Sequence, residues 1–543
     1  MKNVQRTICA ILCMLLCVSG CTAEKAAGGK SAASSAQMID YNKDLARAER
    51  NDRYRTTYEI FVYSFCDSNG DGIGDLNGIR SKLDYIGDLG FDALWLTPVH
   101  PSSTYHKYDV DDYYAIDPKF GTMEDYEALL RECHERGMRV YLDLVLNHTS
   151  SNHAWFRAAA DYLRSLPSGG EPDASACKYL DYYHFQRGPA DGYAPLDGTE
   201  WYYEARFWSE MPDLNLDSEA VRSEIRDVMA FWLGKGVDGF RLDAVTSYYT
   251  GDPAANTEFL RFVTETGRSI DPDCYFVGEA WTDRASIAEL YSSGIDSLFD
   301  FPFANSEGFI ANIVKGSYKA SDYVKGMLLA EEAYGEANPD CVDAPFYTNH
   351  DMGRSAGYYA ADDGPMTKMA YAMSLFMTGN SFVYYGEEIG MKGAGKDENK
   401  RAPMYWSDDA DDPDLCAGPP DMDDVAMKFP SLEDQMQDDL SLWRWFKEVI
   451  RVRNAFPQIA RGVTEDVPSV SDENVAAFFR RSSSDGDLLI VMNLRGETVE
   501  KDLGQAGGSF ALAAVLNTNE EEITYQDGTV TLPAYSIAVF TVP

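Results

Sequence analysis

Four acidic residues of this 543-residue chain each follow or end a short apolar run. They are Asp143 in "RVYLDLVLN", Asp243 in "DGFRLDAV", Glu279 in "CYFVGEAW" and Asp351 in "PFYTNHD". Arg241 stands inside the second run, although charged side chains are almost never buried without partners. Carboxyl groups are among the side chains that move protons in catalysis. Four of them in equivalent positions therefore indicate a reactive site rather than scattered surface charge.

Two histidines strengthen this interpretation. His148 comes just after the first of the four runs, and His350 directly precedes Asp351. A single acid at the end of a strand is usually solvated or paired with a surface cation. Acids, an arginine and two imidazoles together are much harder to explain as surface chemistry, so we expect these side chains to converge.

The runs that carry these residues belong to a longer alternation of apolar strands and amphipathic helices. Eight nearly continuous apolar runs, typical of strands buried on both faces, occur at 58–65, 91–98, 139–147, 238–245, 274–281, 297–303, 345–351 and 381–388. One of the helical patterns between them begins at the capping pair Thr122 and Asp125 and ends at Gly137. This order predicts an α/β fold, a (β/α)8 TIM barrel whose active site lies at the carboxyl ends of its strands.

Two further domains accompany the predicted barrel, which comprises residues 51–148 and 217–457. Residues 149–216 are rich in Tyr, Trp, His and Pro and are too long for a simple loop, so we expect a small inserted domain B after the third strand. Residues 458–543 change to short alternating strands separated by turn residues, which predicts a C-terminal antiparallel β-sandwich.

The N-terminus has the pattern of an export signal. Residues 1–21 combine a short basic start with an apolar core too short to span a membrane as a mature helix, and they end in a sequence similar to a bacterial lipobox. We expect cleavage before Cys21, lipidation of its thiol, and a flexible tether over 22–50. The protein would then be a lipoprotein of the cell envelope, on the extracytoplasmic side of a bacterial membrane. The alternative is an ordinary secretory signal in which Cys21 is incidental.

The charge of the chain restricts its partners. The formal net charge is −41, which electrostatically opposes nucleic acid and anionic lipid surfaces. A neutral substrate suits this balance, and we expect contact with a membrane through the lipid anchor only. The sequence does not indicate an oligomeric state.

Six motifs in order resemble the α-amylase family of retaining glycoside hydrolases. They are "DLVLNH" (143–148), "MPDLN" (211–215), "GFRLD" (239–243), "GEAW" (278–281), "NHD" (349–351) and "GNSFVYYGEE" (379–388). The resemblance covers residues 54–543, and the fold that it implies is the barrel predicted above.

The resemblance implies a role for each of three acids. Asp243 matches the nucleophile, and Arg241, two residues earlier on the same strand face, keeps it ionised. Glu279 matches the general acid/base, which must hold a proton before it can protonate the leaving oxygen. Asp351 matches the acid that binds sugar hydroxyls and steadies the transition state. Retention follows when nucleophile and acid lie about 5–5.5 Å apart.

Further residues match the family's substrate-binding positions. His148 and His350 match imidazoles that hydrogen-bond the sugar at the point of cleavage, and Tyr108 matches the tyrosine that stacks beneath it. Asp109 and Arg354 match a pair that borders the same subsite.

A glycine-rich acidic loop, "DSNGDGIGD" at 67–75, predicts a calcium site. It offers oxygen atoms at alternating positions, from the side chains of Asp67, Asn69, Asp71 and Asp75 and the carbonyl of Ile73. Hard oxygen donors at this spacing suit Ca²⁺. The resemblance favours the same ion, because related amylases and oligo-1,6-glucosidases have such a loop. The alternative is a solvated acidic loop that binds no ion.

The motifs also indicate a specificity. "MPDLN" is intermediate between the oligo-1,6-glucosidase and neopullulanase forms, and Ala244 after the nucleophile resembles α-1,4-acting amylases. The resemblance therefore implies hydrolysis of α-1,4 bonds in starch, glycogen and maltooligosaccharides, with endo action. The alternatives are an α-1,6-acting or neopullulanase-like enzyme and a transglycosylase or isomerase of the same family. A non-enzymatic glucan-binding protein on this fold would lack one of the three acids, and all three are present.

Overall fold

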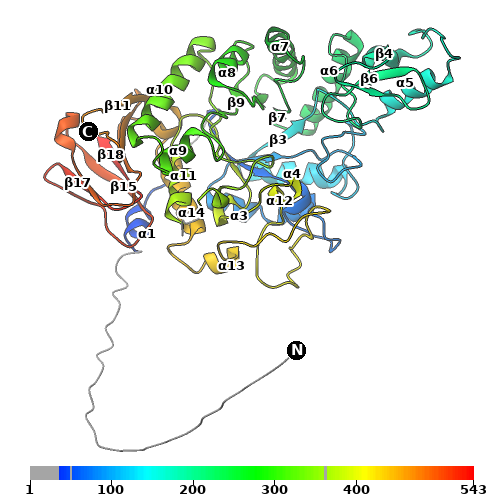
Figure 1. Cartoon of the computed structure of the whole chain (residues 1–543). Helices are drawn as coiled ribbons and strands as arrows, with labels where there is room; N and C mark the ends of the chain where they lie inside the picture. The colour runs from blue at the N-terminus through cyan, green and yellow to red at the C-terminus, as the bar shows by residue number, and fades with distance from the viewer. Residues whose placement is uncertain (1–35, 49–51, 360–363) are drawn as a thin grey trace, which may run out of the picture.

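The centre of the molecule is a barrel of parallel strands in the computed structural model, which describes residues 36–48, 52–359 and 364–543 (Figure 1). Its hydrogen-bonded strands follow the order β10–β1–β2–β3–β7–β8–β9. Their bounds are β1 Thr56–Ile60, β2 Ala93–Leu96, β3 Arg139–Leu144, β7 Gly239–Leu242, β8 Tyr275–Gly278, β9 Ser297–Leu298 and β10 Ser381–Tyr384.

The segment 344–346 closes the barrel between β9 and β10. Parallel bridges join Phe299 to Ala344 and Phe346 to Phe382. The predicted strand at 345–351 is therefore reduced to isolated bridges, and Pro345 explains part of this, because proline has no N–H to give to a ladder. With this segment all eight predicted strand positions are filled, and the predicted TIM barrel is confirmed.

Helices follow the strands, and most of them cover the outside of the barrel, whereas α12 lies at its mouth. Their bounds are α2 Leu76–Ser81, α3 Leu83–Leu89, α4 Met123–Glu135, α6 Glu219–Lys235, α7 Pro253–Ile270, α8 Arg284–Tyr291, α9 Phe309–Val314, α10 Ala320–Ala337, α11 Pro365–Leu375, α12 Asp397–Lys400, α13 Leu432–Gln435, α14 Leu442–Ala455 and α15 Gln458–Arg461. Helix α4 begins as its sequence predicts: Thr122 and Asp125 each accept from the other's backbone N–H in a capping box.

Alternate residues of each strand point into the barrel, and they change from apolar to charged toward its carboxyl end. Tyr141 and Val277 belong to the apolar cluster that fills the interior. Asp143 lies two residues beyond Tyr141 on the same face and is paired in register with Arg241, which is paired with Val277. The acidic and basic side chains thus form a charged layer toward the carboxyl end of the barrel that adjoins the apolar cluster, with Arg241 level with Val277.

Domain B is a small separate unit beside the mouth of the barrel (Figure 1). It contains α5 Ala154–Ser165 and a three-stranded antiparallel sheet in the order β4–β6–β5, with bounds Phe185–Arg187, Trp201–Glu204 and Tyr193–Pro195. An antiparallel bridge from His148 to Asp213 joins the end of the domain to the loop after β3, and a second bridge, from Tyr183 to Leu214, lies within the domain.

The C-terminal domain is a two-layer β-sandwich, as predicted. A five-stranded sheet has the order β11–β12–β13–β18–β15, with bounds Val463–Asp466, Val475–Arg481, Asp487–Asn493, Ser536–Val542 and Ala511–Asn517. A three-stranded sheet has the order β14–β17–β16, with bounds Val499–Asp502, Thr529–Leu532 and Thr524–Gln526. Phe540 and Val530 belong to the cluster between the sheets. Phe478, on the opposite face of the larger sheet, packs toward the barrel, with its ring 6.0 Å from that of Tyr323 in α10.

The segment before the barrel differs from the flexible tether expected over 22–50. Residues Ala36–Asn42 form helix α1, which packs along β15, the edge strand of the larger sheet. The side-chain amide of Asn42 donates to Val515 O over 2.8 Å and accepts from Val515 N over 3.2 Å. It therefore pairs with the edge strand as a neighbouring strand would. The signal segment and Cys21 lie outside the described residues.

Two further observations bear on the sequence predictions. Within the described ranges, no helix is both long and apolar enough to cross a bilayer. Six cysteines in the same ranges are unpaired: Cys66, Cys133, Cys177, Cys274, Cys341 and Cys416.

Candidate active site

Arg241 is the centre of the charged layer. Its side chain is fully buried, and its Nη1 lies 2.9 Å from Asp143 Oδ1 and 2.7 Å from Asp243 Oδ1. Its Nη2 lies 3.0 Å from Glu279 Oε2. One guanidinium therefore holds three carboxyl groups from three strands, which explains how a strand can carry both charges of "GFRLD". It also places the carboxyl groups of Asp243 and Glu279 close together.

Asp143 supports this centre from behind. It is fully buried and accepts from the Tyr108 hydroxyl over 2.9 Å and from the Trp95 indole N–H over 3.2 Å, in addition to its contacts with Arg241. With its oxygen atoms occupied in this way, Asp143 has no free face for a substrate. It braces the site.

Glu279 is held so that it keeps a proton. Its Oε2 accepts from the backbone N–H of Ala244 over 3.0 Å and contacts Arg241, so Oε1 is the oxygen for the carboxyl proton. Burial, opposed by Arg241 and reinforced by the charges of Asp243 and Asp351, raises the pKa of Glu279 to about 8. Ala244 itself has a left-handed backbone, with φ +47°, where the chain turns away from β7.

Asp351 has the opposite character. Burial alone would raise its pKa, but His350, Arg401 and Arg241 nearby lower it below the ordinary value. Arg401 Nη2 lies 2.7 Å from Asp351 Oδ1, and His350 Nε2 lies 3.2 Å from Oδ2. The site thus joins one acid held protonated to another held ionised.

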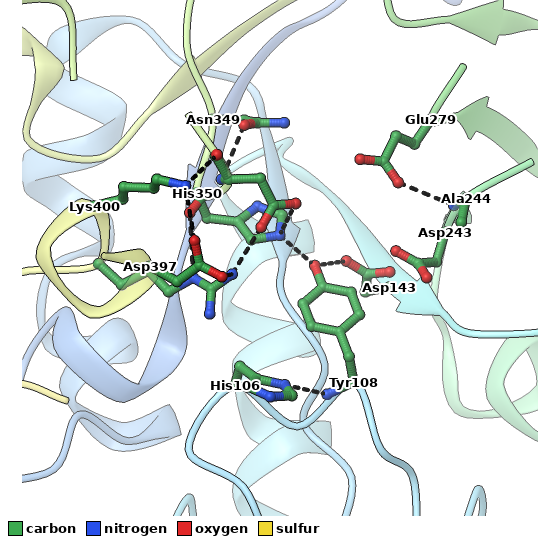
Figure 2. A network of polar contacts seen from close by, with 12 residues as sticks. His106, Tyr108, Asp143, Asp243, Ala244, Glu279, Asn349, His350, Asp397 and Lys400 are labelled. Carbon is green, nitrogen blue, oxygen red and sulfur yellow. Dashed lines mark hydrogen bonds and ion pairs between the residues drawn. The ribbon is translucent and has the colours of Figure 1, made fainter. Parts of the chain in front are cut away.

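Tyr108 and His350 form a stacked pair between these acids. Their rings are 5.4 Å apart at 7°, and the Tyr108 hydroxyl lies 2.7 Å from His350 Nε2. Figure 2 shows the Tyr108 hydroxyl pointing toward both Asp143 and His350, with Asp243 and Glu279 beyond. Burial lowers the pKa of His350 to about 3.

A cavity of about 380 Å³ opens above these groups. Its lining comprises His106, Tyr108, His148, Phe207, Met211, Asp243, Ala244, Thr246, Ser247, Glu279, Trp281, Asp351, Asp397 and Arg401. The structure therefore brings five of the predicted site residues to one cavity: Tyr108, His148, Asp243, Glu279 and Asp351. His148 Nε2 is buried and has no hydrogen-bond partner among the described residues. A substrate hydroxyl at this place would supply the missing hydrogen bond. Arg241 and His350 lie directly behind the lining.

The predicted pair of Asp109 and Arg354 is not found. Asp109 is fully buried and accepts hydroxyl hydrogen bonds from Ser102 and Ser103 over 2.6 and 2.9 Å. Arg354 is equally buried, donates to the carbonyls of Tyr385 and Lys400, and has its guanidinium 4.3 Å from the centre of the Tyr384 ring. Neither residue lines the cavity, because the polar atoms of each side chain bond to nearby loop and strand residues instead.

Other lining residues were not singled out by sequence. Arg401, beside the short helix α12, is the arginine that contacts Asp351. Trp281 and Phe207 line the cavity with about half of each side chain exposed, 52% and 51%. Trp281 lies within the recognised "GEAW" motif, and exposed aromatics there and in domain B are the signal that could have identified them.

The predicted calcium loop has suitable donor atoms. Asp67 and Asp75 are buried, at 3% and 2% exposure, and no ion pair involves either of them or Asp71 among the described residues. Asp67 accepts from the backbone N–H groups of Asn69, Gly70 and Gly72, and Asp75 accepts from Ser68 and Gly78. No set of three or more His, Cys, Asp or Glu side chains in the described ranges has a metal-binding arrangement as it stands. Three acids without a cation nevertheless leave a negative charge that Ca²⁺ would neutralise.

A barrel with these carboxyl groups and imidazoles at its mouth defines a glycoside hydrolase. The description "Alpha amylase, catalytic domain" matches residues 59–462, and "Alpha-amylase SusG C-terminal domain" matches residues 475–539. The chain belongs to the α-amylase family.

Individual relatives span this family's activities. The chain is 38% identical over 441 residues to "Alpha-amylase 3" of Dictyoglomus thermophilum, covering 80% of this chain and 84% of that protein. It is 30% identical to "Oligo-1,6-glucosidase" of Heyndrickxia coagulans, covering 82% and 92%. The solved structure "Eubacterium rectale Amy13B" is similar with a TM-score of 0.92 and 45% identity, covering 93% of this chain and 99% of that one.

Proposed function

We propose that the protein hydrolyses α-1,4-glucosidic bonds of starch, glycogen and maltooligosaccharides with retention of anomeric configuration. The observation that carries this is the contact of Asp243 and Glu279 with one buried guanidinium at the edge of the cavity. Retention requires two carboxyl groups close together, one acting as nucleophile and one holding a proton. Arg241 provides the first condition, and the raised pKa of Glu279 provides the second.

The reaction proceeds in two displacements. Asp243 attacks the anomeric carbon while Glu279 gives its proton to the departing glycosidic oxygen, so that a covalent glycosyl-enzyme forms. Glu279 then takes a proton from water, which attacks the same carbon and releases the sugar. Asp351, His148 and Tyr108 line the cavity around the reacting sugar and hold it there.

Endo action is supported by the walls of the cavity. Trp281 and Phe207 present half-exposed aromatic faces beyond the acids, and such faces are typical of sites that hold extended ligands. These platforms would accept glucosyl units on either side of the cleaved bond. The relative named α-amylase supports the same linkage.

A second candidate is cleavage or transfer at α-1,6 bonds, because relatives named oligo-1,6-glucosidase match the chain over most of its length. The product pattern separates the two. With maltoheptaose and amylopectin we expect early release of mixed maltooligosaccharides in the α-configuration, seen by chromatography and proton NMR. Glucose alone, β-configured products, or turnover of isomaltotriose but not maltotriose would overturn the proposal. Longer oligomers from maltotriose alone would indicate transfer.

We further propose that the loop at 67–75 binds Ca²⁺ through the oxygens of Asp67, Asn69, Asp71, Ile73 and Asp75. The ion would neutralise the loop's unpaired negative charge and stabilise the turn before α2. Removal by a chelator should lower the melting temperature, and Ca²⁺ should restore it. Asp71→Asn should reduce the shift, whereas Asp84→Asn, at an exposed position of α3, should not. An unchanged melting temperature in chelator and in excess Ca²⁺ would refute the site.

The location in the cell is also a proposal. Lipidation at Cys21 would place the enzyme on the extracytoplasmic side of the envelope, where it meets glucans from outside. In a bacterial host, Cys21→Ser should abolish labelling by a fatty-acid probe and release the enzyme into the soluble fraction. Release of the unsubstituted protein without label would instead indicate an ordinary secretory signal.

A further inference from the structure

Glu59, on strand β1, is a buried carboxyl group that no recognised motif contains. It is 1% exposed, and its register partners on β2 and β10 are Trp95 and Tyr384. Its Oε1 lies 2.6 Å from His350 Nδ1 and also accepts the backbone N–H of His350 over 3.3 Å. Glu59 therefore occupies the side of the imidazole that faces away from the cavity.

The other ring nitrogen faces two acceptors. His350 Nε2 lies 2.7 Å from the Tyr108 oxygen and 3.2 Å from Asp351 Oδ2. The Tyr108 hydroxyl has one proton, and it donates that proton to Asp143 over 2.9 Å. The Asp351 carboxylate can only accept and therefore requires a proton on Nε2, and the Tyr108 oxygen, which also accepts from Arg241 Nη1 over 3.4 Å, can accept from the same N–H.

A proton on Nε2 dictates what Glu59 must do. If the imidazole is neutral, Nδ1 presents a lone pair, and Glu59 must be protonated to donate to it over 2.6 Å. If the imidazole is charged, Glu59 is the ionised partner. In both cases the pair has no net charge. A neutral ring with its proton on Nδ1 would instead leave Nε2 facing Asp351 lone pair to lone pair, with an unbalanced carboxylate in the core.

The surroundings favour the uncharged version of the pair. Burial raises the pKa of Glu59 well above its usual range, with Arg241 opposing and Asp351 and Asp143 adding to the shift. Burial also lowers the pKa of His350, which Arg401 and Arg241 reinforce. Both shifts move the shared proton toward the carboxyl group.

We propose that Glu59 is a positioning residue that fixes His350 in its Nε2–H form. This N–H orients Asp351 and keeps the Tyr108 hydroxyl directed at Asp143, which supports Arg241. Glu59 thus acts on Asp243 and Glu279, which it does not touch. The contacts that connect them run through His350, Tyr108, Asp143 and Arg241. The kinetic part of this inference rests on the proposed hydrolysis, whereas the tautomer does not.

Two substitutions in the full chain separate positioning from packing. In Glu59→Gln the amide N–H can still donate to Nδ1, so we expect kcat within about threefold of the unsubstituted enzyme. Glu59→Met is similar in volume but cannot donate, and we expect kcat to fall about 10–100-fold with a smaller change in KM, as for other residues that orient a histidine. Glu388→Met is the control. Glu388 is equally buried, and its side-chain partners among the described residues are the Tyr58 and Tyr85 hydroxyls, so its loss should lower the melting temperature and leave kcat unchanged.

The tautomer is read directly by ¹⁵N NMR of histidine-labelled protein, which contains seven histidines; His350→Asn assigns the resonance. We expect Nε2–H in the unsubstituted protein and in Glu59→Gln, and a mixed or Nδ1–H state in Glu59→Met. A proton on Nδ1 in the unsubstituted protein overturns the proposal, as does Glu59→Met with normal kcat. If the enzyme cleaves no α-glucan, or if Glu59→Met does not fold, the spectra of the unsubstituted protein and of Glu59→Gln still decide which tautomer His350 adopts.

Discussion

The charged layer around Arg241 and the core of the C-terminal sandwich are both buried, yet they contain opposite kinds of side chain. Between the two sheets lie Phe479, Val491 and Phe540, all apolar, which release about 25 cal/mol for each Å² removed from water. At the mouth, Arg241 and Asp143 are fully buried charged residues, and taking ions out of water costs several kcal/mol each unless they are paired. The sandwich core stabilises the fold, whereas the mouth uses part of that stability to prepare chemistry.

The largest expected effect is on the mouth, from Asp243→Asn. The amide cannot act as a nucleophile, so kcat/KM on maltoheptaose should fall at least 10⁴-fold, a barrier increase of more than about 5 kcal/mol. The melting temperature should change by only a few degrees, because the Asn oxygen can still accept from Arg241. Measurable turnover near the original rate would show that the nucleophile lies elsewhere.

The sandwich should respond in the opposite way. Phe540 is fully buried and packs against the rings of Phe510 and Tyr525. Phe540→Ala should reduce the free energy of unfolding by about 3–5 kcal/mol, because it removes apolar contact and leaves a cavity. Urea denaturation measures this loss. At temperatures where the variant is folded, kcat should equal that of the unsubstituted enzyme; a large fall in kcat would show that the two regions are coupled.

The pH dependence of activity and of stability tests the mouth of the barrel separately, because Glu279 lies there. Glu279 must hold a proton to act, and its pKa is raised to about 8, so kcat/KM should fall about tenfold per unit above that pH. For stability the sign follows from linkage. The folded protein keeps this proton between pH 4.5 and about 8 while the unfolded chain releases it, so the Glu279 contribution to stability decreases as pH rises through that window.

Activity and unfolding measured across this range test both parts. Glu279→Gln should lose the hydrolysis and also this part of the pH dependence of unfolding. A basic limit of kcat/KM near pH 5 would contradict the protonated state assigned to Glu279.

The smallest expected effect concerns the edge of the sandwich. Asn42→Ala removes both hydrogen bonds between α1 and Val515, and we expect a loss of about 1–2 kcal/mol in the free energy of unfolding with no change in kcat. Tyr41→Phe, which removes the single hydrogen bond to Leu512 O at an exposed site, should cost less. Equal stability of Asn42→Ala and the unsubstituted protein would show that α1 is not bound through this amide.

The barrel and the positions of its acids could be predicted from the sequence. The periodicity of the apolar runs and the order of the motifs both follow from one (β/α)8 arrangement. Asp143 and Arg241 meet because they are register partners, and Asp243 and Glu279 directly follow the last register pair of β7 and β8; this register is fixed by apolar runs visible in the sequence. The seventh strand was predicted too long because Pro345 interrupts its ladder.

What the sequence did not reveal depends on side-chain direction in loops. Arg354 lies three residues after Asp351, but its guanidinium turns to the carbonyls and rings at the end of β10. Arg401 reaches Asp351 from fifty residues away, through a loop that has no periodic pattern. Helix α1 was missed because its seven residues are stabilised by contacts with β15, almost five hundred residues later, rather than by local propensity.

Helix α1 also determines where a mechanical load would enter the molecule. If Cys21 is lipidated as predicted, residues 22–35 separate the anchor from α1, and a chain of that length spans at most about 50 Å. Tension on the anchor would be taken up where α1 contacts β15 and α14, and α1 and the sandwich lie on the side of the barrel remote from domain B (Figure 1). A pull on such an anchor would therefore first load the contacts of α1, far from domain B, which borders the cavity.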